Sequence, residues 1–337
     1  MPNILPDHVL NHDLAMRRFF GLIGPEHPAY RAAVETLNHC STMPGVVAYA
    51  RRLAGYLQFL KAERIDPRAA DGAVLQRWFR SRSHLRPATC RSELAVVRTF
   101  YRELATLGLV RIDPTYGLKV KGGPAAYRRA MTLDEGRALL ASVRADFADP
   151  RTALIARRDN VIITLGLLMG PRSAEMRRLT YADISLDDNA EITFLRKGHK
   201  EDCLPLAPAA RSAIVEMRNA LAEVGVVVRP TDAVITMVDK RTISWAQKRQ
   251  RQPLPAVGPS TIYRTVVTRL ARAKINPPRR GSHQLRKTCA TLAWLGGAKP
   301  ESVQLLLAHS NLRTTMDHYI APAQGRLAPA WESIDLS

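Results

Sequence analysis

The sequence predicts a mainly α-helical protein of two domains with one small β-hairpin. Apolar residues recur at helical spacing in the first third of the chain, as at Leu53, Leu57 and Leu60. Two short segments, 191–195 and 203–206, favour strands and enclose a Lys-Gly-His-Lys turn, which predicts a hairpin. A length of 337 residues is typical of about two domains, and the 46% of hydrophobic residues suffices for their cores.

The strong positive charge predicts a polyanionic partner. The formal net charge is +20 and the sequence pI is about 10.5, which favours nucleic acid. The four cysteines are far apart and form neither a CxxC pair nor a zinc pattern, so we expect reduced thiols and no metal. No signal peptide and no apolar run of membrane-spanning length is present, so we expect no membrane partner. The predicted location is the cytoplasm, with nucleoid association when the protein is bound to DNA.

The first part of the chain divides into an arm and a helical bundle. Residues 1–43 form an N-terminal arm of unknown role, with helices expected at 14–22 and 30–37. Residues 44–112 hold three successive helical patterns and predict a small bundle. Basic side chains alternate with these apolar stripes, which suits a face on DNA phosphates; a merely solvated face is the alternative. The candidate DNA contacts here are Arg51, Arg52, Arg91 and Arg98.

A basic linker, residues 113–130, separates the bundle from a second domain at 131–320. Its glycines and prolines lie among basic residues, of which Lys121 and Arg128 are candidate DNA contacts. Thr132 with Glu135 three residues later predicts a capping box that starts the second domain.

The second domain combines helices with the hairpin. Asp239 to Val257 is rich in basic residues and is interpreted as a long basic loop, and Ser260 as the cap of the next helix. The helices are expected at 155–169, 207–223, 260–273, 283–295, 300–307 and 312–319, with another short helix beginning near Arg172.

Six residues of this domain lie in contexts that resemble the tyrosine recombinase (phage integrase) family. The contexts are Gly-Pro-Arg-Ser-Ala-Glu, Arg-Lys-Gly-His-Lys, Ser-His-Gln-Leu-Arg, and Leu-Ala-His-Ser-Asn-Leu-Arg-Thr-Thr ending at His-Tyr. The resemblance covers about residues 44–320 and implies a helical core-binding domain followed by a mixed α+β catalytic domain. It assigns the catalytic set Arg172, Lys197, His283, Arg286, His309 and Tyr319.

The resemblance implies phosphoryl transfer without cofactor, metal or ATP. Tyr319, ten residues after His309, matches the nucleophile, which forms a 3′-phosphotyrosine and so keeps the bond energy for resealing. Arg172 and Arg286 match the clamp on the non-bridging oxygens, because two guanidiniums offer planar, bidentate donors. His309 would donate to the same phosphate.

Proton transfer falls to two further residues of the resemblance. His283, three residues before Arg286 on one helix face, matches the base that deprotonates Tyr319. Lys197 on the hairpin turn matches the acid for the leaving 5′-oxygen, with Lys200 as the alternative. Glu175 is expected to orient either Arg172 or His283.

Two positions depart from the family pattern. Ala308 stands where glycine is usual, a small change that we expect to be tolerated. Asp202 stands where many members carry arginine, and we expect it to weaken one phosphate contact. Residues 321–337 are expected to contact a neighbouring protomer, or else to fold back on their own domain.

The function predicted is that of a site-specific DNA recombinase acting through a Holliday junction. The implied partners are double-stranded DNA with paired half-sites and a homotetramer assembled on it, with room for accessory DNA-bending or directionality proteins. A mobile-element integrase is favoured over a chromosome-dimer resolvase by the long N-terminal arm. The alternatives are a type IB topoisomerase or telomere resolvase, and a DNA-binding regulator that does not cut. The residue pattern predicts no particular target sequence.

Overall fold

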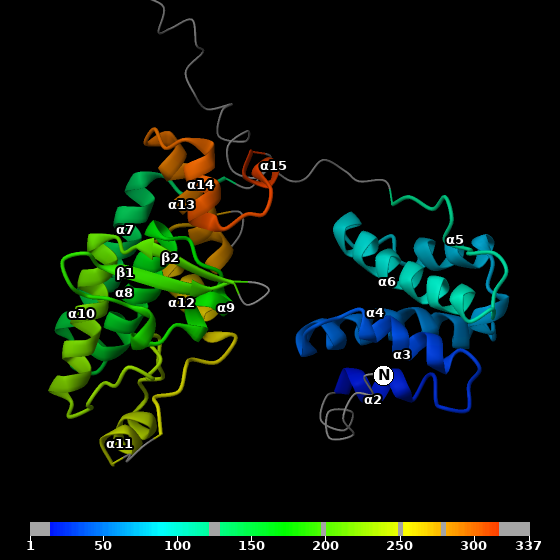
Figure 1. The fold of residues 1–337 in the computed structure, drawn as a ribbon, viewed down its shortest axis with the longest axis horizontal. Coiled ribbons are helices and arrows are strands. Elements are labelled where there is room, and N and C mark those ends of the chain that lie inside the picture. The colour runs from blue at the N-terminus through cyan, green and yellow to red at the C-terminus, as the bar shows by residue number, and fades with distance from the viewer. Residues whose placement is uncertain (1–13, 121–128, 197–199, 249–251, 278–280, 317–337) are drawn as a thin grey trace, which may run out of the picture. The chain divides into compact units, whose positions relative to one another are not determined.

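The structure, a computed structural model, describes residues 14–120, 129–196, 200–248, 252–277 and 281–316. The chain forms two compact units, residues 1–126 and 127–337. Both are built mainly of helices, and the second contains one two-stranded sheet (Figure 1). The predicted fold class is therefore confirmed. No helix in the described residues is long and apolar enough to cross a membrane.

The first unit is a bundle of helices around one aromatic core. Fully buried rings of Phe19, Tyr56, Trp78, Phe100 and Tyr101 fill its centre. The helices of this unit are α2 (Leu14–Phe20), α3 (Tyr30–Asn38), α4 (Met43–Ala62), α5 (Gly72–Ser81) and α6 (Pro87–Thr106), with a 3₁₀ turn at Pro67–Ala69.

Helices α2 and α3 belong to this bundle and share its core. Met16 and Phe19 of α2 and Leu37 of α3 are fully buried in the same cluster as α4 to α6. α2 packs on α4, and α3 packs on α6. The helical domain is therefore larger than the predicted range 44–112, since the described part of the predicted arm is one wall of it.

Two buried tyrosines tie the long helices of the bundle together. The hydroxyl oxygens of Tyr56 and Tyr101 are 2.6 Å apart, and the Tyr101 hydroxyl donates to the Pro67 carbonyl at 3.0 Å. Tyr56 must then donate to Tyr101, because each hydroxyl has one proton. Burial raises the pKa of both phenols, so the chain of hydrogen bonds stays intact over the physiological pH range.

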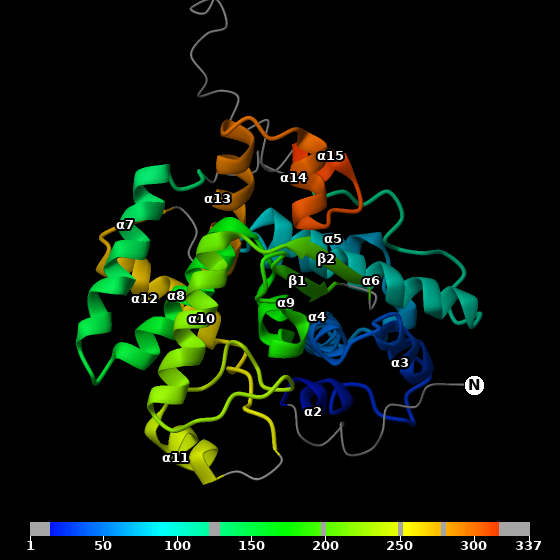
Figure 2. The same ribbon diagram turned by 60° about the vertical axis from the view of Figure 1, so that its left-hand side comes forward.

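The second unit has α8 (Ala153–Leu168) at its centre. α7, α10, α12 and α13 pack against it from different sides (Figures 1 and 2). The other elements are α7 (Leu133–Arg144), α9 (Ser173–Arg178), β1 (Glu191–Leu195), β2 (Glu201–Pro205), α10 (Pro208–Glu223), α11 (Lys240–Lys248), α12 (Thr261–Arg272), α13 (Ser282–Leu295), α14 (Pro300–Leu307) and α15 (Leu312–Thr315), with 3₁₀ turns at Ala145–Ala148 and Tyr181–Asp183.

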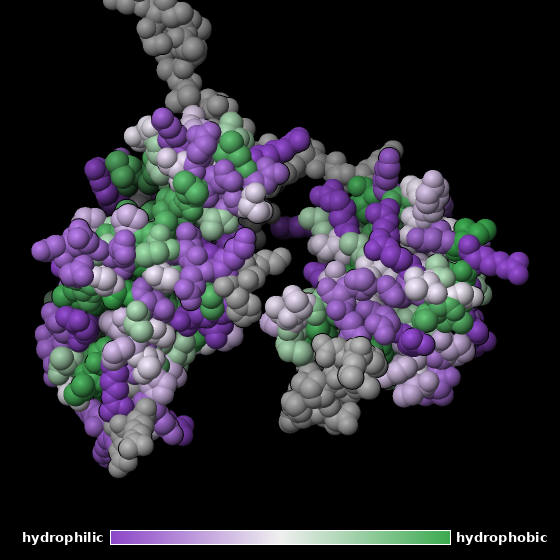
Figure 3. All heavy atoms as spheres, in the orientation of Figure 1, coloured by the Kyte–Doolittle hydropathy of each residue, from purple (hydrophilic) through white to green (hydrophobic). Residues whose placement is uncertain are grey.

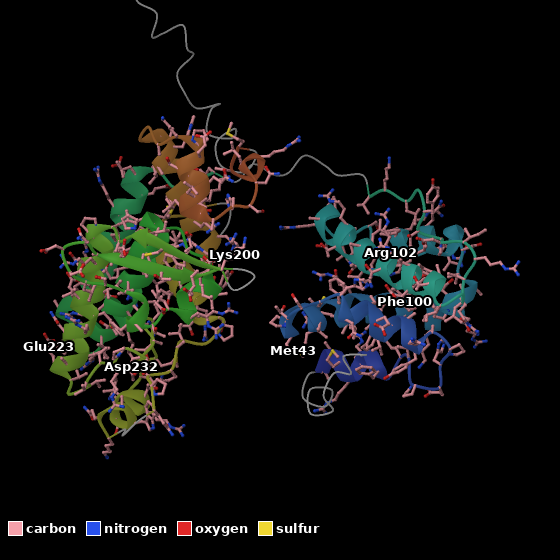
Figure 4. The ribbon with its side chains drawn as sticks, in the orientation of Figure 1. Met43, Phe100, Arg102, Lys200, Glu223 and Asp232 are labelled. Atoms are coloured by element: carbon pink, nitrogen blue, oxygen red, sulfur yellow. The ribbon has the colours of Figure 1, made fainter. Side chains whose placement is uncertain are left out.

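The hairpin pairs β1 with β2 in antiparallel register, Leu195 opposite Glu201 and Phe194 opposite Asp202. Ile192 and Phe194 are fully buried, which fixes the register because a one-residue slip would expose both. Lys200 lies at the tip of the hairpin (Figure 4), and its carbonyl accepts from the Arg196 amide at 2.7 Å.

The start of α7 and the end of α14 are fixed by local backbone chemistry. The Thr132 hydroxyl accepts from the Glu135 amide at 3.1 Å and the Glu135 carboxylate accepts from the Thr132 amide at 2.9 Å, which confirms the predicted capping box. Ala308 ends α14 in the left-handed region, at φ 47°. A Cβ is disfavoured there, which gives a physical reason for the glycine that the family resemblance implies at this position.

The predicted basic loop at 239–257 is wrong in part, because Lys240–Lys248 form α11. Asp239 starts this helix by accepting from the Thr242 amide at 3.0 Å, and Ala246 is its buried contact. The prediction failed because the basic residues obscured a short amphipathic pattern. Ser260 precedes α12 as expected, but its side chain makes no capping bond. Hydrophilic residues cover much of the surface of both units in the view of Figure 3.

Helices α8 and α13 approach so closely that only glycine fits at position 166. A Cβ there would lie 2.5 Å from Leu285 Cδ1 and 2.8 Å from its Cβ. By contrast, a Cβ on Gly136 in α7 would make an ordinary contact at 4.0 Å with Leu167.

We expect Gly166→Ala to lower the free energy of unfolding by about 1–3 kcal/mol, because the α8–α13 interface is overpacked. Gly136→Ala, the matched control in a helix, should raise it by about 0.5–1 kcal/mol through helix propensity. Urea denaturation of the two variants measures both. A stabilised Gly166→Ala variant would show that the two helices separate at little cost.

Candidate active site

Arg172 enters the site from a turn that requires glycine. α8 ends at Leu168, and Gly170 adopts φ +59°, where a Cβ would also lie 2.7 Å from Leu307 Cδ2. Arg172 is then the N-cap of α9, the short helix expected from the sequence. Its side chain is 39% exposed, so part of the guanidinium faces solvent.

The Arg286 guanidinium is buried and joins two turns of the unit. Arg286 on α13 is only 2% exposed. It donates to the carbonyl of Gly170 at 2.6 Å and to the carbonyl of Leu307 at 2.5 Å. Its Nη2 also lies 3.0 Å from Nε2 of His309. The two turns that lead to Arg172 and His309 therefore meet at this side chain.

The contacts of His309 fix its tautomer. Arginine can only donate, so His309 Nε2 must accept from Arg286 and the ring proton is on Nδ1. Nδ1 then donates to the hydroxyl of the fully buried Thr315 at 2.8 Å. The Gln304 amide holds the His309 carbonyl at 2.9 Å. For His309 to donate to a phosphate, Nε2 must gain a proton and release Arg286.

Glu175 links Arg172 to the hairpin. It accepts from the Arg172 amide at 2.7 Å and from Arg172 Nη1 at 2.8 Å, and its other neighbour is Arg196 Nη1 at 2.7 Å. Burial favours the neutral acid, but the hydrogen bonds from Arg172 and the charges of both arginines outweigh it and lower the pKa of Glu175. Of its two predicted partners, Glu175 therefore orients Arg172.

His283 lies at the start of α13, beside the start of α9. The hydroxyls of Ser173 and Ser282 are 2.5 Å apart and join the two helix ends. Gly281, at φ 100°, precedes them, and a Cβ there would lie 2.6 Å from the Tyr263 ring. His283 is exposed, whereas Arg286 one turn later is buried. His283, the candidate base, therefore lies at the surface of the site, and Arg286 lies in its interior.

Arg196 is a buried residue of the site that was not predicted from the sequence, and its side chain is 5% exposed. Its Nε and Nη2 bind Asp202 at 3.0 and 2.8 Å. Asp202 therefore pairs with a neighbouring arginine, a role that the family pattern does not suggest. The one available signal was that Arg196 and Asp202 carry opposite charges and are diagonal neighbours across the hairpin.

The remaining predicted residues fall into two groups. Lys197, Tyr319, Lys121 and Arg128 lie outside the described residues. Arg51 and Arg91 are exposed on the first unit and Arg52 is half-buried. Arg98 instead donates to the Leu118 carbonyl, which fixes the segment after α6. Arg51 lines a cavity of about 650 Å³ together with Arg18 and Arg82.

The geometry gathers two arginines and two histidines at neighbouring helix ends of the second unit. Guanidiniums bind a phosphodiester and stabilise its transition state, and imidazoles move protons. Such an arrangement is suited to phosphoryl transfer, the class of chemistry that the sequence predicts.

Comparison with known proteins agrees with this class. The model of the phage integrase family matches residues 130–326, more than half of the chain. A tyrosine recombinase XerC of Caldanaerobacter subterraneus is 29% identical over 69% of this chain, a match that spans 59% of that relative's length. A tyrosine recombinase XerC of Haemophilus ducreyi is 28% identical over 79% of this chain and 80% of its own.

Solved structures share the fold. XerH site-specific recombinase, bound to a palindromic difH substrate in a post-cleavage complex, matches with a TM-score of 0.68 over 94% of both chains at 17% identity. A lambda integrase dimer bound to a COC′ core site matches with a TM-score of 0.64 over 92% of this chain and 79% of that chain at 13% identity. The chain belongs to the phage integrase family, that of the tyrosine recombinases.

We expect Glu175→Gln to lower the free energy of unfolding by about 1.5–3 kcal/mol at pH 7, because two charged donors are left without a carboxylate acceptor. Because the pKa of Glu175 is lowered by folding, its carboxylate stabilises the fold fully at pH values above 4.5, the ordinary pKa of a glutamate. This contribution is lost as the pH falls through the lowered pKa, so the difference from the unsubstituted protein should narrow in acid. Denaturant titrations between pH 7 and pH 3 measure it. Glu201→Gln, at an exposed position on β2, is the control, and a pH-independent difference would contradict the assignment.

Proposed function

We propose that the protein is a site-specific DNA recombinase that cuts and rejoins DNA through a 3′-phosphotyrosine at Tyr319 and a Holliday junction, without ATP or metal. The observation that carries this proposal is the meeting of the Arg172, Arg286 and His309 segments at the hydrogen bonds of one buried guanidinium. These residues belong to three different elements: Arg172 is the N-cap of α9, Arg286 lies on α13, and His309 follows α14. A site that binds one phosphate from several sides needs such a convergence.

Arg172 and Arg286 share the phosphate unequally. Arg172 offers a partly exposed guanidinium whose orientation is set by Glu175, so it can meet the phosphate without rearrangement. Arg286 is buried and already bonded to two carbonyls and to His309. A phosphate that replaces His309 as the partner of Arg286 would free Nε2 of the imidazole. Once protonated, that nitrogen becomes a third donor to the phosphate.

The proton transfers rest on sequence position together with the geometry of α13. His283 is exposed at the edge of the site, where it can accept the Tyr319 proton. Lys197, next to the buried Arg196, would protonate the leaving 5′-oxygen. These two roles and the nucleophile remain predictions for the residues named.

The proposed partner is duplex DNA with paired half-sites, bound by a homotetramer. The net charge of +20 supports a DNA partner. Among the solved relatives of the fold are XerH bound to difH substrate and a lambda integrase tetramer bound to a Holliday junction. Accessory DNA-bending or directionality proteins, and nucleoid association, remain predictions.

The nucleophile can be tested by covalent trapping in cells. We expect the unsubstituted protein to leave adducts at a discrete DNA site after denaturation, and Tyr319→Phe to leave none, because the phenolate oxygen is the attacking atom. Sequencing of the captured ends locates the site. Adducts without site preference would instead indicate topoisomerase-like cutting. Adducts that persist in Tyr319→Phe would exclude this tyrosine.

Helix α11 provides a test of the DNA surface. Lys240, Arg241 and Lys248 are exposed on it, and the helix has no acidic residue. We expect the triple alanine variant to bind DNA more weakly, with the slope of log K against log salt reduced by about 0.9 for each phosphate that is no longer neutralised. Titrations at several salt concentrations measure this slope. Arg137→Ala, at a 71% exposed arginine of α7, is the control. An unchanged slope in the triple variant would place α11 away from the DNA.

A further inference from the structure

The Arg196 guanidinium lies in the interior of the second unit with every side of it in contact. One edge binds Asp202 through Nε and Nη2, and Nη1 binds Glu175. The guanidinium carbon lies 4.8 Å from the centre of the Phe194 ring, and Nη2 lies 3.4 Å from the Leu306 carbonyl. A buried charge is unfavourable unless it is paired in this way.

The charges of this cluster balance within four side chains. Arg172 and Arg196 carry two positive charges, and Glu175 and Asp202 carry two negative charges. The two middle members are buried, since Arg196 and Glu175 are each 5% exposed, whereas Asp202 is 31% and Arg172 is 39% exposed. The contacts therefore run from Asp202 through the buried Arg196 and Glu175 to the partly exposed Arg172.

The two oxygens of Glu175 are divided between the arginines. Oε1 accepts from Arg172 Nη1, while Oε2 accepts from the Arg172 amide and from Arg196 Nη1. The bond from Arg196 thus fixes the rotation of the carboxylate, and that rotation decides where Oε1 holds the Arg172 guanidinium. Asp202 in turn fixes Arg196 from the neighbouring strand.

Arg196 also connects the hairpin to the helix end before His309. It approaches the Leu306 carbonyl, while Arg286 binds the next carbonyl, that of Leu307. The last carbonyls of a helix lack partners within the helix. Two buried arginines from different elements therefore satisfy successive carbonyls at the end of α14.

We propose that Arg196 is a positioning residue for phosphoryl transfer: it holds Glu175 in the orientation that aims Arg172 at the phosphate, and Asp202 holds Arg196. This inference rests on the proposed function only in that Arg172 binds the scissile phosphate. Asp202 then supports one phosphate contact, whereas the sequence pattern alone predicts that it weakens one.

The test replaces Arg196 with methionine, which keeps an unbranched side chain over Phe194. Arg211→Met is the control, since this arginine of the same unit donates to the Leu186 carbonyl. We expect single-turnover adduct formation on saturating DNA to fall about 10- to 100-fold in Arg196→Met, because a small displacement of a catalytic group has an effect of that order. DNA affinity should stay within about twofold, since Arg172 is one of many phosphate contacts.

The pH profile separates positioning from general weakening of the fold. The charged groups bonded to Glu175 are Arg172 and Arg196, and Asp202 acts on it through Arg196. Without Arg196 the carboxylate protonates more readily, so the acid limb of the adduct-formation rate should move to higher pH. Arg196→Lys keeps the positive charge, so in this variant the acid limb should return most of the way to its position in the unsubstituted protein. A rate and an acid limb equal to those of Arg211→Met would overturn the proposal.

A second measurement needs neither DNA nor activity. In a double-mutant cycle, the shifts in Tm caused by Arg172→Ala and Arg196→Met should not add, because both arginines act on Glu175. In a Glu175→Gln background the same two shifts should become additive. Additive shifts with Glu175 in place would overturn the proposal. If the unsubstituted protein formed no adducts but the cycle was non-additive, the recombinase function would be contradicted. The coupling of Arg196 to Arg172 through Glu175 would still be supported.

Discussion

The buried guanidinium of Arg286 is the interaction on which the rest of the site depends. Its donors reach Gly170 and Leu307, residues that lie more than a hundred positions apart in the chain, and its third neighbour is His309. Each bonded carbonyl belongs to a turn with one residue of positive φ, Gly170 in the first and Ala308 in the second. Removal of one partner would leave a buried charge unsatisfied, which is far less favourable than an exposed one.

Two networks of arginine and carboxylate or carbonyl groups therefore share the α14 end. The Arg286 network positions His309, and the Arg196 network positions Arg172 through Glu175. A third buried pair joins α12 to α8: Arg269 Nε donates to Asp159 Oδ2 at 2.9 Å. This pair takes no part in either network. The second unit thus uses buried arginines in two ways. Arg196 and Arg286 contact the end of α14 and position site residues, whereas Arg269 joins two helices of the core.

The sequence predicted what local periodicity and motif spacing determine. Apart from α11, the helices of both units follow from patterns of a few residues, as do the hairpin and the Thr132 capping box. The sequence did not predict that Met16 and Leu37 join the bundle core, because only long-range packing buries them. Nor did it predict the role of Arg196, since its partner Glu175 lies 21 positions earlier on α9 and only tertiary packing brings the two side chains together.

The glycine at position 166 has a consequence for how this family can diverge. Because its missing Cβ leaves the space that the Leu285 side chain occupies, the two positions constrain each other. A relative that carries alanine or a larger residue at the position of Gly166 must carry a smaller residue than leucine at the position of Leu285, or hold α8 and α13 further apart. Since α13 carries both His283 and Arg286, a wider separation of the two helices would displace these two side chains from the other residues of the site. Covariation of these two positions is therefore the expected record of selection on the site.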